Sequence, residues 1–243
     1  MRLSRFFVDM PLAVGQTLTL PTETAHYATN VLRLGVGATV TLFNGYGGEY
    51  LARLTICHKK TVQLSIEAFC DREGELKLML VSAISRPEHF DYTLQKAVEL
   101  GVVRIVPVIT ERSPPLDLAK IPKREQHWRK IVTSACEQCG RNRLPELLSS
   151  MPLSEWLSKP QADTTRILLS PQGQNGLNSI SVNNQSLIVL IGAEGGFSAV
   201  EIRNALDVGY IAVSLGPRIL RTETAALAVL AICQAMWGDL DSE

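Results

Sequence analysis

Two segments of the sequence combine residue types that could carry chemistry. The first, from Ile191 to Ser198, reads Ile-Gly-Ala-Glu-Gly-Gly-Phe-Ser and joins an apolar stretch to a predicted helix. The second, from Leu215 to Ala226, places two arginines, a glutamate and two threonines between another apolar stretch and a helix. Glycines let a backbone approach a ligand closely at a helix N-terminus, and open α/β sheets bind ligands at the carboxyl ends of their strands. Together the loops predict one ligand site, although turn geometry explains the glycine loop alone equally well.

A third segment ends a predicted helix in Arg141, Asn142 and Arg143. Basic residues at a helix C-terminus stabilise the helix through its dipole, which is a purely structural explanation. Two arginines that flank an asparagine could equally bind phosphate and a base. Both interpretations remain open at the level of the sequence.

Several other chemistries lack the residues they need. Cys136 and Cys139 are spaced as in zinc and redox sites, but no second ligand pair follows, and both fall on the apolar face of the predicted helix. The four histidines are scattered, so a metal enzyme is not expected. The segment 212–216 has alanine where a nucleophile elbow has its first glycine, and no histidine follows His127. The Walker A and dinucleotide-binding motifs are missing as well.

The elements that must position these loops change character along the chain. Residues 1–70 favour short strands at 17–20, 39–43, 50–57 and 61–69 with one helix at 26–34, which is typical of a small β-barrel or sandwich. A polar linker follows at 71–75. Beyond it, strands predicted at 78–84, 104–109, 166–170, 187–191 and 211–215 alternate with helices at 87–100, 122–139 and 198–208. The strand at 187–191 is apolar throughout, and Ser198 with Glu201 forms a capping box at the start of the last helix. This alternation predicts an α/β domain with a parallel sheet.

Composition and charge bound the classes of protein that fit. The 243 residues include 24 basic and 24 acidic side chains and are 46% apolar, as expected for a globular protein and not for a disordered one. The segment 104–146 carries 9 basic and 5 acidic residues, so a polyanion would bind there. The five irregularly spaced cysteines favour a reducing compartment. With no apolar run of about 20 residues and no signal-peptide core, we expect a cytoplasmic protein without a membrane span.

The first two segments, together with Gln95-Lys96-Ala97-Val98-Glu99-Leu100-Gly101 and Glu137-Gln138-Cys139-Gly140-Arg141-Asn142, resemble the signatures of the bacterial ribosomal small-subunit uridine N3-methyltransferases of the SPOUT superfamily. The resemblance covers essentially the whole chain and is most specific from Leu215 to Ala225. It implies a PUA-like, RNA-binding β-barrel at 1–70, a trefoil-knotted α/β methyltransferase domain at 77–243, and a homodimer. Ala193 stands where the family usually has proline, so we expect a slightly less rigid loop with the same function.

The activity that the resemblance implies is methyl transfer from S-adenosylmethionine to N3 of a uridine in 16S rRNA on the assembled small subunit, without a metal. We expect the cofactor to be held by Leu169, Gly192, Gly196, Leu215, Gly216, Ile219, Leu220, Arg221, Thr222 and Ala225. We expect RNA to be held by Arg5, Arg33, Lys123, Arg124, Arg141, Asn142 and Arg143.

The catalytic candidates are Arg221, Glu194 and Glu223. The uridine imide must lose its N3 proton, so fixed positive charge is needed beside the resulting anion, and Arg221 offers a permanently charged donor fork. Glu194 or Glu223 could accept the proton, but a carboxylate beside Arg221 could equally form a structural ion pair. Two other functions remain open: an RNA-binding module without catalysis, and a phosphate-ligand enzyme that uses the loop 192–196 as an anion site.

Overall fold

The computed structural model describes residues 3–58, 61–71, 76–160 and 163–240. The chain divides into two compact units. The first unit comprises Met1–Glu73 together with Cys136–Leu144, and the second comprises Gly74–Ala135 together with Pro145–Glu243. The sequence predicts two consecutive domains, at 1–70 and 77–243. In the structure, Cys136–Leu144 groups with the first unit, which this division does not include.

The first unit is built on a five-stranded sheet with the order β1-β3-β4-β5-β2. Only the pairing of β1 with β3 is parallel. Its strands are β1 (Arg5–Phe7), β2 (Thr17–Thr19), β3 (Thr39–Phe43), β4 (Glu49–His58) and β5 (Thr61–Cys70). In β5, Val62, Leu64 and Ile66 are buried at alternate positions, as the period of a half-buried strand requires. The apolar face of this sheet forms the core of the unit.

The helical part of the first unit begins earlier than the sequence predicts. The helix α1 (Thr22–His26) follows Pro21 and continues into a π-helical turn, η1 (Tyr27–Val31), whereas the expected helix covered 26–34. Pro21 explains the start, because its fixed φ suits the residue before the first helical turn and it needs no N–H partner. Ala25 and Ala28 from these turns join the core of the sheet.

The second unit is built on a seven-stranded parallel sheet with the order β12-β10-β11-β6-β7-β8, and β9 also pairs with β7. Its strands are β6 (Lys77–Ala83), β7 (Arg104–Ile109), β8 (Glu146–Leu147), β9 (Met151–Pro152), β10 (Thr165–Leu169), β11 (Ser186–Ile191) and β12 (Ile211–Val213). The central strand β11 is buried from Leu187 to Ile191, as expected for a strand covered on both faces. The predicted parallel α/β architecture is confirmed.

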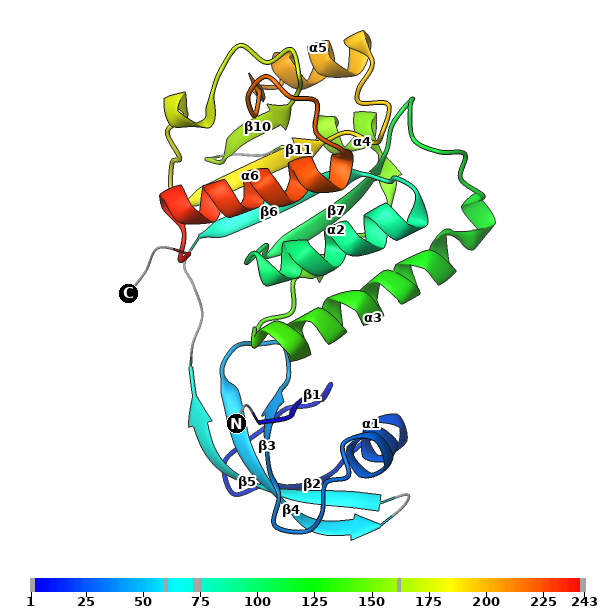
Figure 1. The fold of residues 1–243 in the computed structure, drawn as a ribbon, viewed down its shortest axis with the longest axis vertical. Helices are drawn as coiled ribbons and strands as arrows, with labels where there is room; N and C mark the ends of the chain where they lie inside the picture. The colour runs from blue at the N-terminus through cyan, green and yellow to red at the C-terminus, as the bar shows by residue number, and fades with distance from the viewer. Residues whose placement is uncertain (1–2, 59–60, 72–75, 161–162, 241–243) are drawn as a thin grey trace. The chain divides into compact units, whose positions relative to one another are not determined.

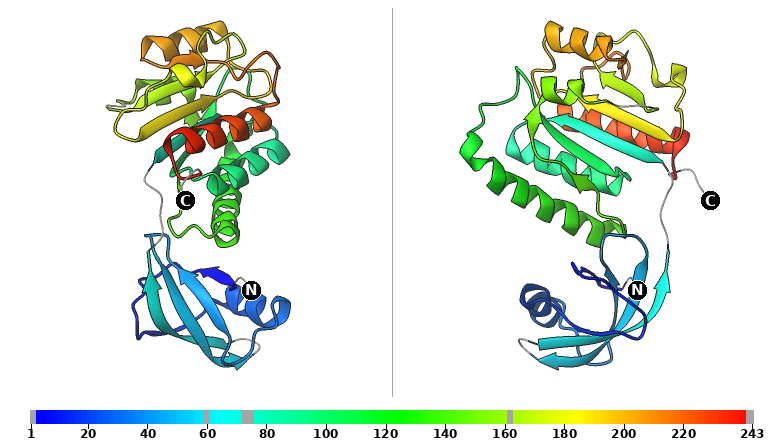
Figure 2. Two further views of the ribbon diagram at one scale, coloured as in Figure 1. Left: turned by 60° about the vertical axis from the view of Figure 1, so that its left-hand side comes forward. Right: turned by 180° about the vertical axis from the view of Figure 1, so that it is seen from behind.

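Helices cover the two faces of this sheet. The helices are α2 (Pro87–Glu99), α3 (Ile121–Cys139), α4 (Leu153–Ser158), α5 (Ala199–Asp207) and α6 (Thr222–Trp237), with short 3₁₀ turns η2 (Leu118–Lys120) and η3 (Leu177–Ser179). α2 and α6 lie side by side along one face (Figure 1; other directions in Figure 2). On α2, Phe90 packs against Trp128 of α3 with ring centroids 4.7 Å apart.

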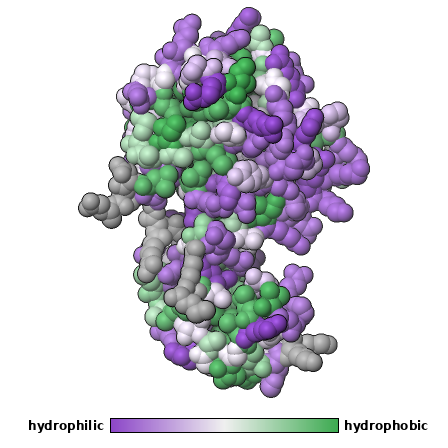
Figure 3. All heavy atoms as spheres, in the orientation of Figure 1, coloured by the Kyte–Doolittle hydropathy of each residue, from purple (hydrophilic) through white to green (hydrophobic). Residues whose placement is uncertain are grey.

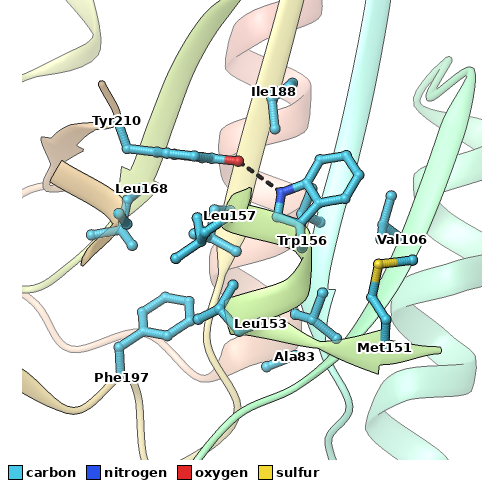
Figure 4. Packing of buried hydrophobic residues seen from close by; sticks show 14 of the residues in the cluster. Ala83, Val106, Met151, Leu153, Trp156, Leu157, Leu168, Ile188, Phe197 and Tyr210 are labelled. Carbon is cyan, nitrogen blue, oxygen red and sulfur yellow. Dashed lines mark hydrogen bonds between the residues drawn. The ribbon is translucent and has the colours of Figure 1, made fainter. Parts of the chain in front are cut away.

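The other face of the sheet packs against α4 and α5 through one apolar cluster (Figure 4). Its polar centre is a hydrogen bond of 2.9 Å that Trp156 Nε1 donates to the Tyr210 hydroxyl. Burial raises the pKa of Tyr210 to about 12, so this hydroxyl stays protonated at neutral pH. Phe197 and Ala193 of the glycine loop belong to the same cluster. The core therefore anchors the loop that the sequence singled out.

Among the helices of the described ranges, none combines the length and the apolar character needed to cross a membrane.

Candidate active site

A cavity of about 360 Å³ lies where the carboxyl ends of β10, β11 and β12 meet in the second unit. This volume falls within the usual range for small-molecule sites. Three loops supply the walls: the one after β10, the glycine loop after β11 and the arginine-bearing loop after β12. The lining residues are Arg112, Leu169, Ser170, Pro171, Gln172, Ile191, Gly192, Ala193, Glu194, Gly195, Gly196, Phe197, Ile202, Val213, Leu215, Gly216, Arg218, Ile219, Leu220, Thr222 and Ala225.

The glycine loop is a tight turn whose glycines are required by geometry. Gly196 N donates to Ala193 O across 2.8 Å, and Gly196 has a φ of 67°, in the left-handed region. A Cβ on Gly192 would lie 3.0 Å from backbone carbons of Gly196. Arg112 Nη1 donates to Gly195 O across 2.7 Å. Two hydrogen bonds therefore hold the loop, one across the turn and one from Arg112.

The helix after this loop begins at a complete capping box. Ser198 Oγ accepts from Glu201 N, and a Glu201 carboxylate oxygen accepts from Ser198 N across 2.8 Å, as the sequence predicts. The other carboxylate oxygen of Glu201 accepts from Glu111 N across 2.9 Å. One buried carboxylate thus ties the start of α5 to the segment that follows β7.

A set of contacts between the segment after β10 and strand β12, called the brace below, is not evident from the sequence. The segment after β10 runs beside β12, where Ser214 N donates to Asn175 O across 3.0 Å and Asn175 Nδ2 donates to Ala212 O across 3.2 Å. A Cβ on Gly173 would lie 2.5 Å from the backbone of Val213, so only glycine fits there. The same rule that pointed to the other two loops, position at the carboxyl end of a parallel strand, would have found this one.

The residues expected to hold the cofactor converge on this cavity with one exception. All of them line it except Arg221, which is exposed at the N-cap position of α6. Arg221 lies between the lining residues Leu220 and Thr222, so its contact with the cofactor stays a prediction. Other lining residues were not among those expected to hold the cofactor: Phe197 and Arg218 from the same two loops, and Arg112, Ser170, Gln172 and Ile202 from other segments. Ile219 is 86% exposed at the cavity, which is unusual for an isoleucine.

The two candidate carboxylates meet at a histidine that the sequence did not single out. His89, in the first turn of α2, places Nδ1 3.3 Å from Glu194 Oε1 and 3.6 Å from Glu223 Oε2. Arg86 N donates to the same Glu194 Oε1 across 3.1 Å. The expected pairing partner was Arg221, and the structure replaces it with His89. A basic side chain in the first turn of a neighbouring helix has no local signal that points to these carboxylates.

The electrostatics of Glu194 favour its charged form. Burial raises the pKa of its carboxyl, but the hydrogen bonds from backbone N–H groups and the nearby charges of His89 and Arg86 together hold the pKa below its usual value. Glu194 is therefore a carboxylate at neutral pH, at the wall of the cavity.

The residues expected to hold RNA fall into two groups. Arg33 and Arg143 are exposed in the first unit, where Arg141 is partly buried. Lys123, which is exposed, and Arg124, which is partly buried, belong to α3 in the second unit. Figure 3 shows hydrophilic side chains gathered over α3.

Arg5 and Asn142 correct the sequence expectation. Asn142 is fully buried, and the Arg5 side chain is 8% exposed. Arg5 pairs with Glu49 and donates to Asn142 Oδ1 and to Arg141 O. Because a buried arginine needs a partner charge and hydrogen bonds, these groups hold Cys136–Leu144 in the first unit and do not face a phosphate.

The comparisons with known proteins agree with this arrangement. A family model described as "RNA methyltransferase domain" matches residues 72–234, and one described as "RNA methyltransferase PUA domain" matches residues 20–67. The chain is 33% identical over 242 residues to the ribosomal RNA small subunit methyltransferase E of Buchnera aphidicola, covering 98% of each chain.

Two solved structures are similar over nearly the whole chain. The ribosomal RNA small subunit methyltransferase E of Neisseria gonorrhoeae, bound to S-adenosyl methionine, has a TM-score of 0.93 and 39% identity, covering 98% of this chain and 100% of that one. A putative methyltransferase of Legionella pneumophila, in complex with the cofactor SAM, has a TM-score of 0.92 and 38% identity, covering 99% and 100%. With its PUA-like first unit, its parallel α/β second unit and these matches, the chain belongs to the RNA methyltransferase family.

Proposed function

We propose that this protein transfers the methyl group of S-adenosylmethionine to N3 of a uridine in 16S rRNA on the assembled small ribosomal subunit. The observation that carries the proposal is the cavity formed by the glycine loop and the arginine-bearing loop. Support comes from the two similar proteins that were solved with this cofactor.

The residues at the cavity fit the cofactor. Leu169, Leu215 and Leu220 offer the flat apolar walls that an adenine ring needs. The glycine backbone of Gly192 and Gly196 lets the chain approach the ligand without a side chain in between. When bound, the cofactor supplies an electrophilic methyl group.

The chain's own residues then position the uridine and manage its N3 proton. Arg221 adjoins Leu220 and Thr222 of the cavity wall and is exposed, so its guanidinium can stabilise the uridine anion. Glu194 is charged at the wall, so it can accept the N3 proton, and Glu223 lies in the first turn of α6 as the alternative acceptor. Because the nucleophile is the anion, the rate rises with pH.

RNA binding involves basic residues of both units under this proposal. We assign phosphate contacts to Arg33, Arg141 and Arg143 in the unit that begins the chain, and to Lys123 and Arg124 on α3. We divide the chain functionally into a barrel that binds RNA, at about residues 1–70, and a methyltransferase domain from residue 77. Arg5 and Asn142 contribute indirectly, because they fix the segment that carries Arg141 and Arg143.

The protein acts as a homodimer in the cytoplasm under this proposal. The apolar side chains of Ile232, Met236 and Leu240 are exposed on and after α6, and Figure 3 shows apolar side chains gathered over this helix. An exposed apolar patch of this kind is typical of a protein–protein interface. Size-exclusion chromatography with light scattering measures the mass directly.

The test of the activity is mass spectrometry of nucleosides from 16S rRNA. A strain that lacks the gene should lose one 3-methyluridine, and purified protein with cofactor should restore it on small subunits from that strain. An unchanged 3-methyluridine content would contradict the proposal. If naked 16S rRNA is methylated at the same rate as small subunits, the assembled subunit is not required as the substrate.

The test of the cofactor site is a pair of substitutions on α6. Ala225→Phe fills the cavity that Ala225 lines, whereas Ala235 is exposed on the same helix. Calorimetry should show S-adenosylmethionine affinity reduced at least about tenfold in Ala225→Phe and unchanged in Ala235→Phe, because overpacking a site costs on the order of 1–3 kcal/mol. Equal affinities in the two variants would place the cofactor elsewhere. If the wild type does not bind S-adenosylmethionine, the alternative of an RNA-binding module without catalysis is favoured. If ATP raises the melting temperature of the protein, the phosphate-ligand enzyme is favoured.

A further inference from the structure

We infer that His89 is a positioning residue for the methyl-transfer site: its protonated ring bridges Glu194 and Glu223 and thereby couples the glycine loop to the start of α6. The inference rests on the proposed function, because it concerns the groups that would handle the uridine proton. It adds a positioning residue that the proposed function does not contain.

Three separate elements bring their side chains to this point. His89 comes from α2, Glu194 from the loop between β11 and α5, and Glu223 from the first turn of α6. The side chains of His89 and Glu223 are only 26% and 16% exposed. Within the described ranges, His89 Nδ1 and Glu223 Oε2 are both buried and form no hydrogen bond. Buried polar atoms of this kind are costly unless a charge interaction compensates them.

The protonation state of His89 decides whether that compensation exists. A doubly protonated ring carries a positive charge 3.3 Å from one carboxylate oxygen and 3.6 Å from the other, within ion-pair distance of both. A neutral ring can donate Nδ1–H to one carboxylate at most, and then the two negative charges repel each other without a cation between them. The bridge therefore requires the charged ring.

Other charged groups near the bridge do not replace it. From α2 the exposed Arg86 lowers the pKa of Glu194 by its charge and by its backbone N–H, and the acidic Glu88 follows it in the first turn. On the glycine loop, Arg112 binds the carbonyl of Gly195. In the described part of the chain, His89 is the group that lies within ion-pair distance of both carboxylates.

The bridge has a consequence for the cavity. Glu194 lines the cavity, and Thr222, the residue before Glu223, lines it too. Glu194 is held through one oxygen, Oε1, which faces both Arg86 N and His89 Nδ1. Loss of the charge on His89 should leave Glu194 held by Arg86 N but no longer linked to Glu223, so the glycine loop is no longer tied to the start of α6. The carboxylate would then be held less firmly in the position where it can accept a proton.

The experiment compares His89→Lys, His89→Gln and the wild type with a matched control. Lysine keeps a positive charge from pH 6 to about pH 9, and glutamine has none at any pH. The control is His127→Gln, because His127 also pairs with a carboxylate, Asp91, at 2.7 Å, but lies outside the cavity. The readout is kcat for methylation of small subunits with saturating S-adenosylmethionine.

We expect His89→Gln to have a kcat about tenfold below that of His89→Lys, because the positive charge between the two carboxylates is lost. The kcat of His89→Lys should stay close to that of the wild type, because lysine supplies the positive charge that the proposal assigns to His89. His127→Gln should follow the wild type throughout.

Wild-type kcat in His89→Gln, or a kcat of His89→Lys as low as that of His89→Gln, would overturn the inference. If the wild type methylates no subunit RNA, the proposed function fails, and that outcome is distinct from an unchanged kcat of His89→Gln in an active enzyme.

Discussion

Arg221 is the residue on which the proposed chemistry depends most. It is exposed at the start of α6 and is not part of the cavity wall, although its neighbours Leu220 and Thr222 are. Arg221→Lys keeps the charge and removes the planar donor fork. We expect kcat to fall at least about tenfold, because a preorganised donor at a developing anion is worth that much or more.

Cofactor affinity should separate this effect from damage to the cavity. Calorimetry should give the same affinity for S-adenosylmethionine in Arg221→Lys as in the wild type. Arg203→Lys, an exposed arginine of α5, is the control and should change neither quantity. A wild-type kcat in Arg221→Lys would leave Arg221 with no role beyond the start of the helix.

The buried carboxyl of Glu137 makes the stability of the fold depend on pH. Burial raises the pKa of its carboxyl, although Phe7 N donates to it across 2.9 Å and the charge of Arg5 lowers the pKa. A carboxyl with a raised pKa in the folded state favours folding at low pH, and this contribution is lost as pH rises through that pKa. Glutamine keeps the acceptor oxygen without the charge.

Glu137→Gln should therefore raise the melting temperature at pH 7 and leave it nearly unchanged at pH 4. Glu23→Gln, an exposed acid of α1, should show no such gain at pH 7. Thermal unfolding followed by circular dichroism measures both. A lower melting temperature at pH 7 in Glu137→Gln would mean that attraction to Arg5 outweighs the cost of burial.

At the scale of elements, the brace between the segment after β10 and strand β12 can be tested with two glycines. A Cβ on Gly173 would lie 2.5 Å from the backbone of Val213, while a Cβ on Gly176 meets nothing within 4 Å. We expect Gly173→Ala to lower the free energy of unfolding by about 1–3 kcal/mol, as overpacking does, and also to weaken cofactor binding.

Gly176→Ala is the matched control, since it lies in the same segment and has a φ of −92° that alanine accepts. Denaturant unfolding gives the stabilities, and calorimetry gives the affinities. Equal stability in the two alanine variants would show that β12 does not need the close approach of Gly173.

At the scale of the whole molecule, RNA binding should draw on both units. Arg143 is exposed in the first unit and Lys123 in the second. Each phosphate that the protein neutralises contributes about 0.7 to 0.9 to the slope of log affinity against log salt. Arg143→Ala and Lys123→Ala should each reduce that slope by this amount, and the double variant by the sum.

Arg53→Ala is the control, because Arg53 is an exposed arginine already paired with Glu67. It should leave the slope unchanged, and all variants should bind S-adenosylmethionine normally. An unchanged slope in Arg143→Ala would restrict that arginine to a structural role after α3. An unchanged slope in Lys123→Ala would confine RNA binding to the first unit.

The sequence by itself determined what depends on short-range pattern. Alternation in β5, the continuous apolar run of β11 and the capping box at Ser198 all appear in the structure, because burial repeats with the period of each element. The loops 191–198 and 215–226 also could be placed together, since carboxyl ends of parallel strands share one edge of a sheet.

Only the tertiary structure decided which distant residues meet. Arg5 and Asn142 are 137 positions apart, and their burial together places Cys136–Leu144 in the first unit. His89 lies between Glu194 and Glu223 although neither carboxylate is near it in sequence. Such contacts depend on the path of the chain through space and leave no periodic trace in the sequence. The contact of His89 with these two carboxylates therefore became visible only once α2, the glycine loop and α6 were in place.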